Sequence, residues 1–322
     1  MTALQEGVVS ALFPSACSVI VGGQTLRCGF PGPDFRRPSA KKRNPRSGVC
    51  GADPILPAVG DRVRIERIGS DAGRIVELIP STNRISRAVS DSSRGHPIRQ
   101  VLAANIDQIA AFCAVDHPPP EWHLLDRFLV LAERSGIPAV ILLSKSDLSP
   151  QSGSAASELA AEAQEYRRIG YRVTGCSVKT GLGIEEIRTM LRNRTTLLLG
   201  KSGAGKSSLL NALYPEWNLR VSGVSRFGEG RCTTPNAVLF RLPCGGAVVD
   251  TPGIRRFELW DEGESNPADG FREMRDCIGH CRFGAGCRHG EEPGCAVRRA
   301  VEAGRVSPRR FRSMIRLAGD SS

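Results

Sequence analysis

The chain has 322 residues, enough for two or three domains, and 40% of them are apolar, which excludes a wholly disordered protein. Its formal net charge of +11 favours an acidic partner, with nucleic acid as the first candidate and an anionic membrane as the second. The sequence shows neither a basic-then-apolar amino-terminal segment nor a run of about 20 apolar residues. We therefore expect a cytosolic protein without a membrane partner.

Residues 1–86 contain short β-type runs separated by turn residues, at 8–9, 17–21, 59–65 and 73–79. Several strands in so short a segment predict a small barrel. The stretch 30–57 is rich in proline, glycine and basic residues, and its length predicts a mobile loop. Its basic residues are Arg36, Arg37, Lys41, Lys42, Arg43 and Arg46.

From about residue 98 the pattern changes to buried strands that alternate with longer helices, as an α/β sheet requires. The predicted strands span residues 106–115, 139–144, 172–177, 195–199 and 246–249. The predicted helices span residues 122–135, 157–169, 184–192 and 208–213. After residue 259 the chain becomes polar and glycine-rich, and it ends in a predicted arginine-bearing helix from residue 296 onward.

A phosphate-loop motif joins the predicted strand 195–199 to the helix that follows it, which is the structural context this motif needs. Its backbone N–H groups are expected to surround phosphates, with Lys206 reaching the β- and γ-phosphates and Ser207 binding Mg²⁺. The residues assigned to it are Gly200, Lys201, Ser202, Gly203, Ala204, Gly205, Lys206, Ser207 and the adjoining Ser208.

Two further segments fit the γ-phosphate end of such a site. Asp250 follows a short apolar strand and is expected to hold Mg²⁺, while the N–H of Gly253 is expected to meet the γ-phosphate. Upstream, Thr233 and Thr234 lie in a polar loop, and either one fits a switch threonine that closes over the metal. The sequence does not choose between the two threonines.

Two strand ends carry residues that fit a guanine base. Asp147 is suited to accept hydrogen bonds from guanine N1–H and its exocyclic amine, which adenine does not offer in that geometry. The residues assigned to base binding are Ser144, Lys145, Asp147, Ser177, Val178 and Lys179. These motifs precede the phosphate loop, whereas most GTPases have the reverse order. Because the folded sheet sets the spatial roles, a circular permutation leaves the site intact.

The whole set resembles the circularly permuted, ribosome small-subunit-dependent GTPases of the RsgA type. Segments that carry this resemblance include residues 58–63, 102–108, 230–234 and 250–257, together with the cysteine- and histidine-containing tail. The resemblance covers nearly the whole chain. It implies an OB-fold barrel at 1–86, a permuted P-loop GTPase domain at 98–260 and a mainly helical zinc domain at 261–322.

The resemblance further implies late assembly of the small ribosomal subunit, with rRNA contact and hydrolysis of GTP, with Mg²⁺, stimulated by that particle. We expect a monomer. An alternative of another class is an rRNA-binding protein in which guanine nucleotide is mainly a regulatory ligand. A P-loop kinase is disfavoured because Asp147 and Ser177 fit guanine and no lid for an acceptor substrate is evident.

The chain departs from the family pattern at several positions. Ser144 stands where the family usually has asparagine, Cys232 where it usually has a histidine proposed to assist hydrolysis, and Lys201 where glutamine is common. Apart from these three departures, the residue after Gly253 is Ile254, within the segment that matches the family, and it is not a water-orienting glutamine. We therefore predict slow intrinsic hydrolysis, with catalysis resting on phosphate charge stabilisation and a contribution from the partner.

Four of the eleven cysteines lie close together near the carboxyl end, and in a cytosolic chain such a cluster indicates a metal site. Cys281, Cys287, His289 and Cys295 are the predicted ligands of one structural Zn²⁺. Cys277 and His280 remain alternative ligands. Five residues separate Cys281 from Cys287, one more than in the family, and the extra residue is expected to bulge at residues 284–286.

The basic loop and the arginines of the tail are predicted to bind rRNA phosphates. The tail arginines are Arg298, Arg299, Arg305, Arg309, Arg310, Arg312 and Arg316. Because residues 250–253 lead almost directly into the zinc domain, a further hypothesis is that nucleotide state moves that domain relative to the barrel.

Overall fold

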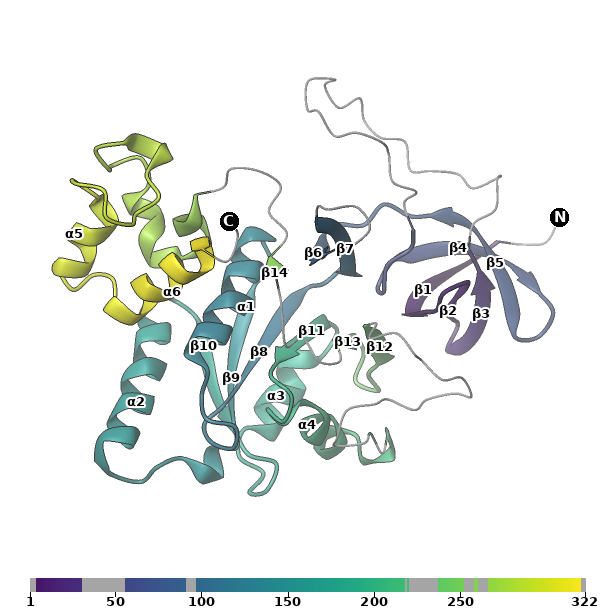
Figure 1. Ribbon diagram of the computed structural model, residues 1–322. Coiled ribbons are helices and arrows are strands. Elements are labelled where there is room, and N and C mark those ends of the chain that lie inside the picture. Colours follow the sequence, from purple (N-terminus) through teal and green to yellow (C-terminus); the bar gives the residue numbers. More distant parts are fainter. Residues whose placement is uncertain are drawn as a thin grey trace.

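The computed structural model describes residues 4–30, 56–90, 97–217, 219, 237–251, 258–259 and 266–319. A small barrel lies at one end of the molecule, an α/β sheet in the middle and a helical unit at the other end (Figure 1). We call residues 266–319 the C-terminal unit. The predicted combination of a barrel, an α/β sheet and a small, mainly helical unit is confirmed.

The barrel consists of β1 (Gln5–Leu12), β2 (Ala16–Val21), β3 (Gln24–Gly29), β4 (Arg62–Ile68) and β5 (Ala72–Leu78). Pairing of β1 with β4 closes it, and alternate apolar side chains fill its interior. The strand predicted at 59–65 begins later, at Arg62, because Gly60 turns the chain with φ +90°. A Cβ atom at Gly60 would lie 2.1 Å from the carbonyl oxygen of Ala104, so only glycine fits. Most of the predicted loop, including its basic residues, lies outside the described residues.

The central sheet has five parallel strands in the order β10-β9-β8-β11-β13. They are β8 (Gln108–Ala114), β9 (Ala139–Ser144), β10 (Arg172–Cys176), β11 (Thr195–Gly200) and β13 (Ala247–Asp250). The antiparallel strand β12 (Val238–Arg241) pairs with β13 and, at Val238, with Ala11 of β1. The barrel is thereby joined to the sheet through the backbone.

Helices cover both faces of this sheet, so its strands are apolar on both sides. Along β8, Ile109 and Ala111 pack toward α1 (Trp122–Arg134) and α2 (Gly153–Arg168). Ala110 and Phe112 pack toward α3 (Ile184–Leu191) and α4 (Lys206–Leu213) on the other face. The helices predicted to begin at 157 and 208 begin earlier, at Gly153 and Lys206.

A β-hairpin that the sequence did not predict joins the barrel to the central sheet. Its strands are β6 (Arg84–Ser90) and β7 (Pro97–Ala104), and β14 (Glu258–Leu259) pairs with β6. Beside the hairpin, the side-chain amide of Asn83 both donates to and accepts from the backbone of Ile106, at 2.8 and 2.9 Å. The Asn105 side chain donates to the carbonyl of Gly60 at 2.9 Å. These contacts hold the barrel against the hairpin.

The C-terminal unit contains three 3₁₀ turns and two α-helices. They are η3 (Pro267–Gly270), η4 (Arg272–Cys277), η5 (Gly284–Gly286), α5 (Ala296–Glu302) and α6 (Pro308–Gly319). The prediction of one helix from residue 296 is wrong, because Gly304 takes a left-handed φ of +70° and Pro308 starts a second helix. Within the described part of the chain, every helix is too short or too polar to span a lipid bilayer.

A buried group of charges fastens α6 to the helices of the central sheet. We call it the Asp126 cluster. Its members are Asp126, Glu162, Tyr166, Glu273, Arg309 and Arg310. Arg310 and Arg309 each lie 2.6 Å from one oxygen of Asp126, and both Arg310 and Asp126 are fully buried. Burial alone would raise the pKa of Asp126, but the two guanidinium charges hold that pKa below its ordinary value.

This cluster corrects part of the predicted phosphate-binding surface. Arg310 also pairs with Glu273 at 2.6 Å, and Arg309 pairs with Glu162 at 2.7 Å. Arg309 and Arg310 therefore face the interior, and the prediction that they bind rRNA phosphates is wrong. The tail arginines that remain exposed are Arg298, Arg299, Arg305, Arg312 and Arg316.

Replacing Arg310 should strongly destabilise the protein, because its loss leaves Asp126 and Glu273 as buried charges without their strongest partner. We expect Arg310→Met to lower the free energy of unfolding by about 3–5 kcal/mol in urea titrations. Arg312→Met, on the exposed side of the same helix, should change it by less than about 0.5 kcal/mol. Equal effects of the two substitutions would contradict a stabilising role for the cluster.

Candidate functional site

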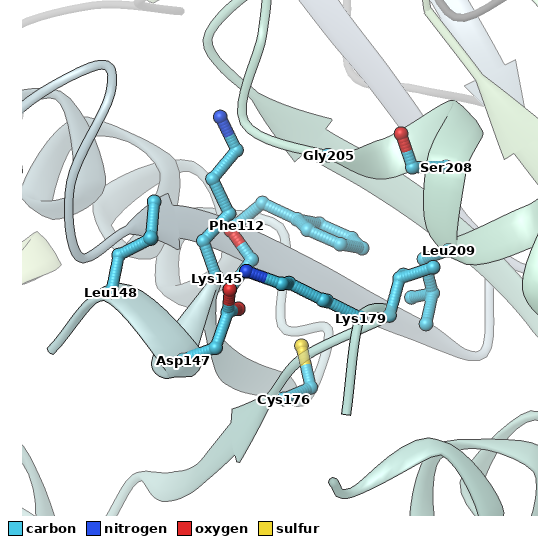
Figure 2. A pocket seen from close by; sticks show the side chains of 11 residues that line it. Phe112, Lys145, Asp147, Leu148, Cys176, Lys179, Gly205, Ser208 and Leu209 are labelled. Carbon is cyan, nitrogen blue, oxygen red and sulfur yellow. The ribbon is translucent and has the colours of Figure 1, made fainter. Parts of the chain in front are cut away.

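A pocket of about 400 Å³ opens at the carboxyl ends of the parallel strands. Phe112 of β8, Ser144 at the end of β9 and Cys176 at the end of β10 line it. The remaining lining residues are Lys145, Asp147, Leu148, Val178, Lys179, Gly205, Ser208 and Leu209. Figure 2 shows Asp147 and Lys179 on one side of the ring of Phe112 and Gly205 and Ser208 on the other. The predicted base-binding segments and the phosphate loop thus border one cavity.

Asp147 is held in place by the neighbouring strand end. The hydroxyl of Ser177 donates to Oδ1 of Asp147 at 2.6 Å, and the same hydroxyl accepts from the backbone N–H of Thr180 at 3.2 Å. These bonds link the turn after β9 to the loop after β10. The carboxylate of Asp147 therefore has a defined orientation at the edge of the pocket.

Lys145 takes a left-handed backbone conformation, with φ +59°. Its ammonium group donates to the carbonyl of His117, in the loop between β8 and α1. The same loop contacts the phosphate loop, because Lys201 forms an ion pair with Glu121. Loop 115–121 thus contacts both the base-binding residue Lys145 and the phosphate loop, a role that the sequence analysis did not predict.

The phosphate loop runs between β11 and α4, and the eight-residue helix directs its amino-terminal N–H groups toward it. Lys206 lies across this loop, with Nζ donating to the carbonyl oxygens of Gly200 and Lys201 at 2.7 and 3.3 Å. Burial lowers the pKa of Lys206, while the nearby charge of Asp250 acts in the opposite direction. The ammonium group therefore lies at the phosphate loop, where the motif places the lysine that binds the β- and γ-phosphates.

Asp250 is the last residue of β13, which pairs with β11 on the side opposite β8. Burial raises the pKa of its carboxyl group, and the charge of Lys206 partly offsets that rise. Its Oδ1 atom is buried and has no hydrogen-bond partner among the described residues. A buried carboxylate oxygen left in this way is suited to a hydrated cation or to a metal-bound water.

Ser144 connects the two halves of the pocket directly. Its hydroxyl donates to the carbonyl of Ala204, in the phosphate loop, at 2.6 Å. Ser144, one of the residues that depart from the family pattern, therefore joins β9 to the phosphate loop. Thr233, Thr234 and Gly253 lie outside the described residues, as does Cys232.

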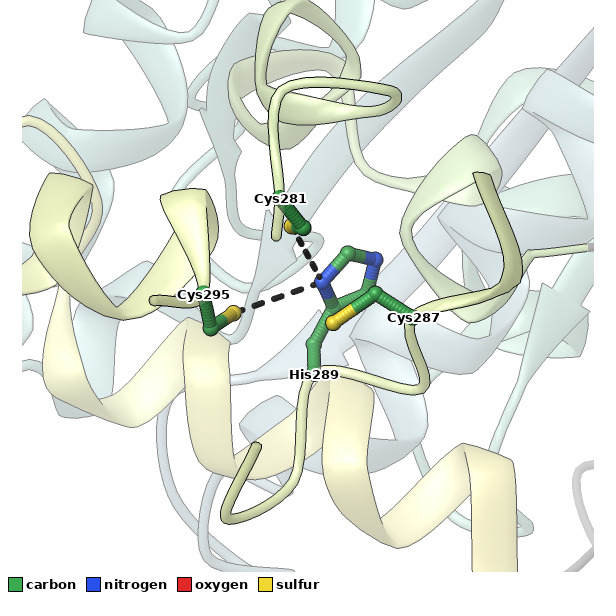
Figure 3. Close-up of side chains that lie close together, drawn as sticks. All are labelled: Cys281, Cys287, His289 and Cys295. Atoms are coloured by element: carbon green, nitrogen blue, oxygen red, sulfur yellow. Dashed lines mark hydrogen bonds between the residues drawn. The ribbon is translucent and has the colours of Figure 1, made fainter. Parts of the chain in front are cut away.

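The four predicted metal ligands come together in the C-terminal unit (Figure 3). The ligand atoms of Cys281, Cys287, His289 and Cys295 all lie within 4.8 Å of one another, and all four residues are buried. Nδ1 of His289 is 3.5 Å from Sγ of both Cys281 and Cys295. Cys277 and His280 are not part of this group. Three sulfur atoms and one imidazole nitrogen form a donor set suited to a closed tetrahedral site.

The extra residue between Cys281 and Cys287 is accommodated in the 3₁₀ turn η5, as predicted for residues 284–286. The N–H of Gly284 donates to the carbonyl of Cys281 at 2.9 Å, and the N–H of Cys287 donates to that of Gly284 at 3.4 Å. The turn takes up the added length while the two cysteines remain beside each other.

Asn266 supports the imidazole of His289 from behind. Its Oδ1 atom lies 2.9 Å from Nε2 of His289 and accepts from the N–H of Ala268 at 3.0 Å. Its side-chain Nδ2 donates to the carbonyl of Cys287 at 3.3 Å. Because Oδ1 acts as an acceptor, Nε2 carries the proton and Nδ1 keeps its lone pair for a metal. No sequence signal identified Asn266, which lies 23 residues before His289.

Comparisons with known proteins show which family this chain is similar to. The sequence profile described as RsgA GTPase matches residues 78–260. The small ribosomal subunit biogenesis GTPase RsgA of Gemmatimonas aurantiaca is 42% identical over 266 residues, which cover 81% of this chain and 83% of that protein. The RsgA of Chromohalobacter salexigens is 42% identical over 256 residues, which cover 79% and 72%.

Two solved structures have a fold similar to that of this chain. YjeQ from Thermotoga maritima matches with a TM-score of 0.71 and 27% identity, over 99% of each chain. YloQ, described as a circularly permuted GTPase, matches with a TM-score of 0.66 and 26% identity, over 99% of this chain and 95% of that one.

Proposed function

Because the chain belongs to the RsgA GTPase family, we propose that it acts late in assembly of the small ribosomal subunit and that this particle stimulates its hydrolysis of GTP. Membership in this family makes the chain a GTP-hydrolysing enzyme with a permuted order of motifs. The observation that carries the site assignment is that Asp147 and Gly205 line the same pocket. These residues belong to motifs that occur in reversed order along the chain.

In the proposed complex, the guanine base lies between Phe112 and the loop after β10. Asp147 accepts from guanine N1–H and the exocyclic amine, and Ser177 keeps that carboxylate in position. The backbone N–H groups of Val178 and Lys179 are available for guanine O6, and the aliphatic part of Lys145 lies along the base. Because adenine carries no donor at the corresponding position, this arrangement selects guanine.

The phosphates lie along residues 200–208. Lys206 moves from its carbonyl partners onto the β- and γ-phosphates and neutralises charge that develops during hydrolysis. Mg²⁺ supplies further charge stabilisation when bound, with the Ser207 hydroxyl and, through water, Asp250 as the groups that hold it. The buried, unpartnered Oδ1 of Asp250 supports this assignment. Thr233 or Thr234, and the N–H of Gly253, complete the proposed site.

We propose that the protein alone hydrolyses GTP slowly. Cys232 and Ile254 offer no strong general base or amide for orienting the attacking water. Stimulation by the ribosomal particle would then require that the particle order this end of the site or contribute a group to it. The proposed slow rate follows from these side chains.

The metal proposed for the C-terminal unit is one structural Zn²⁺ per chain, held by Cys281, Cys287, His289 and Cys295. All four donors belong to the protein, which leaves no open coordination position for catalysis. Asn266 orients His289 for this role.

The proposed macromolecular partner is rRNA in the small subunit, bound by a monomer in the cytoplasm. Arg298, Arg299, Arg305, Arg312 and Arg316 provide exposed positive charge on the C-terminal unit. The barrel and the basic residues between 36 and 46 are proposed to contribute further contacts. The segment between Thr251 and Asn266 links the nucleotide site to the C-terminal unit, so we retain the hypothesis that nucleotide state alters the placement of that unit relative to the barrel.

Substitution of two residues at opposite ends of the pocket tests the proposed catalytic site. Lys206→Ala should reduce GTP hydrolysis in the presence of purified small subunits by at least about 100-fold, since charge stabilisation at the phosphates is lost. Asp147→Asn should weaken GTP binding about 10- to 100-fold and favour xanthosine triphosphate, because the amide can donate to the 2-oxo group.

Hydrolysis should be measured with and without small subunits, and nucleotide binding by competition with fluorescent GDP. Rapid turnover by the protein alone would contradict the proposed stimulation. An Asp147→Asn protein that still preferred GTP over xanthosine triphosphate would contradict the assigned base site.

Zinc removal and replacement of Asn266 test the metal site. We expect one zinc per chain in metal analysis and a lower unfolding temperature after chelation, because the four ligands then lose their common partner. Asn266→Ala should weaken zinc binding about 10- to 100-fold in a chelator competition. His280→Ala should leave the affinity unchanged. Folded, unoxidised protein without zinc would disprove the site.

Binding of the small subunit should weaken as salt concentration rises, because phosphate contacts release counterions. We expect at least a roughly tenfold loss of affinity between 50 and 200 mM salt, corresponding to two or more phosphate contacts. The double variant Arg298→Gln/Arg299→Gln should flatten the plot of log affinity against log salt. A slope equal to that of the unsubstituted protein would exclude these two arginines from the interface.

A further inference from the structure

Ser144 lies where the base end of the pocket meets the phosphate loop. The residue is 4% exposed, and its hydroxyl donates to the carbonyl of Ala204 at 2.6 Å. A Cβ atom on Gly205 would lie 3.9 Å from Cβ of Ser144, which puts the two residues in near contact. Asp147 and the loop after β10 border another part of the same pocket.

The hydroxyl of Ser144 has a single hydrogen to donate. A carbonyl oxygen has none, so the contact with Ala204 must use that hydrogen. The oxygen of Ser144 therefore has only lone pairs left to offer a bound ligand. An asparagine at this position would keep a second N–H after donating one to the same carbonyl.

The expected position of guanine follows from its two attachments. Asp147 takes the edge that carries N1–H and the exocyclic amine, and the ribose on N9 must lead toward the phosphate loop. The imidazole ring of the base, with N7, then lies at the phosphate-loop end of the pocket, beside Ser144. N7 is a hydrogen-bond acceptor, so it gains nothing from the lone pairs of the serine.

Three other side-chain donors line the pocket, and they are Lys179, Lys145 and Ser208. Ser208 belongs to the segment 200–208, along which the phosphates are proposed to lie. Lys179 and the N–H groups beside it belong to the loop whose Ser177 is bonded to Asp147, so they approach from the Asp147 side. That side of the base presents O6. The ammonium of Lys145 is bonded to the carbonyl of His117.

From these contacts we infer that Ser144 fastens the phosphate loop to β9 and leaves guanine N7 without a side-chain donor. The inference rests on the proposed function, since it concerns the same guanine site. Its consequence is a defined specificity: the chain selects guanine at the N1 and exocyclic-amine edge and accepts guanine nucleotides in which a C–H group replaces N7.

The test compares GTP with 7-deaza-GTP, in which a C–H group replaces N7, by competition with fluorescent GDP. The unsubstituted protein should bind the two triphosphates within about twofold of each other. Ser144→Asn should prefer GTP by about three- to tenfold, the usual range for one neutral hydrogen bond. Ser144→Ala should weaken both triphosphates by the same factor, because the bond to Ala204 is lost while N7 loses nothing.

Ser146→Ala is the matched control. Its hydroxyl also donates to a backbone carbonyl, that of Leu143 at 2.8 Å, but Ser146 does not line the pocket. It should leave both affinities unchanged, and urea titrations of all variants show whether each one is folded.

Discrimination of fivefold or more against 7-deaza-GTP by the unsubstituted protein would overturn the inference. So would a folded Ser144→Ala protein with unchanged affinities, or a folded Ser144→Asn protein that does not discriminate. Failure of GTP itself to compete would overturn the proposed function, and this inference with it.

Discussion

Parallel pairing of the central strands is the constraint on which the rest of the structure depends. Strands β8, β9, β10, β11 and β13 all run in the same direction, so their carboxyl ends meet at one edge of the sheet. Ser144, Ser177, Gly200 and Asp250 each lie at or just beyond one of these ends. Chain order does not enter into this arrangement. A permuted sequence can therefore bring the same chemical groups together, provided that the strands keep their neighbours in the sheet.

The barrel and the C-terminal unit are attached to this sheet by different kinds of contact. On one side, β12 pairs with β1 of the barrel, and the asparagines beside the β6–β7 hairpin strengthen that connection. On the other side, the C-terminal unit is fastened to α1 and α2 by the Asp126 cluster. Because α1 begins at the loop that contacts Lys145 and Lys201, the C-terminal unit and the nucleotide pocket share one supporting helix.

The departures from the family pattern have different physical consequences. Ser144 retains a bond to the phosphate loop, so the support of that loop does not require an asparagine. The extra residue between Cys281 and Cys287 is absorbed by a short turn, so the four ligand atoms still converge. Lys201 pairs with Glu121 at the start of α1, an interaction that a neutral glutamine would make without the charge. These three changes are each accommodated by contacts close to where they occur.

Sequence alone determined the chemistry that is encoded in consecutive residues. The phosphate loop is recognisable because its backbone geometry and its lysine belong to one continuous segment, and the same holds for Asp147 beside Lys145. The barrel was predictable from its short β-type runs separated by turn residues, and the fold class of the central domain from the alternation of strands and helices. The metal site was predictable as a group because its four ligands lie within fifteen residues.

Tertiary structure decided which distant groups meet. The partner of Ser144 lies 60 residues away along the chain, and the separation of Arg310 and Asp126 is 184 residues. In sequence, Arg310 and Arg312 look alike as cationic tail residues. Arg310 shares a helix face with the buried Met314 and Leu317, which hints at burial, but nothing local identifies its acidic partner. The spacing of residues within one segment shows whether it forms a helix or a strand. The partner of a side chain, in contrast, depends on how separate helices and strands pack together.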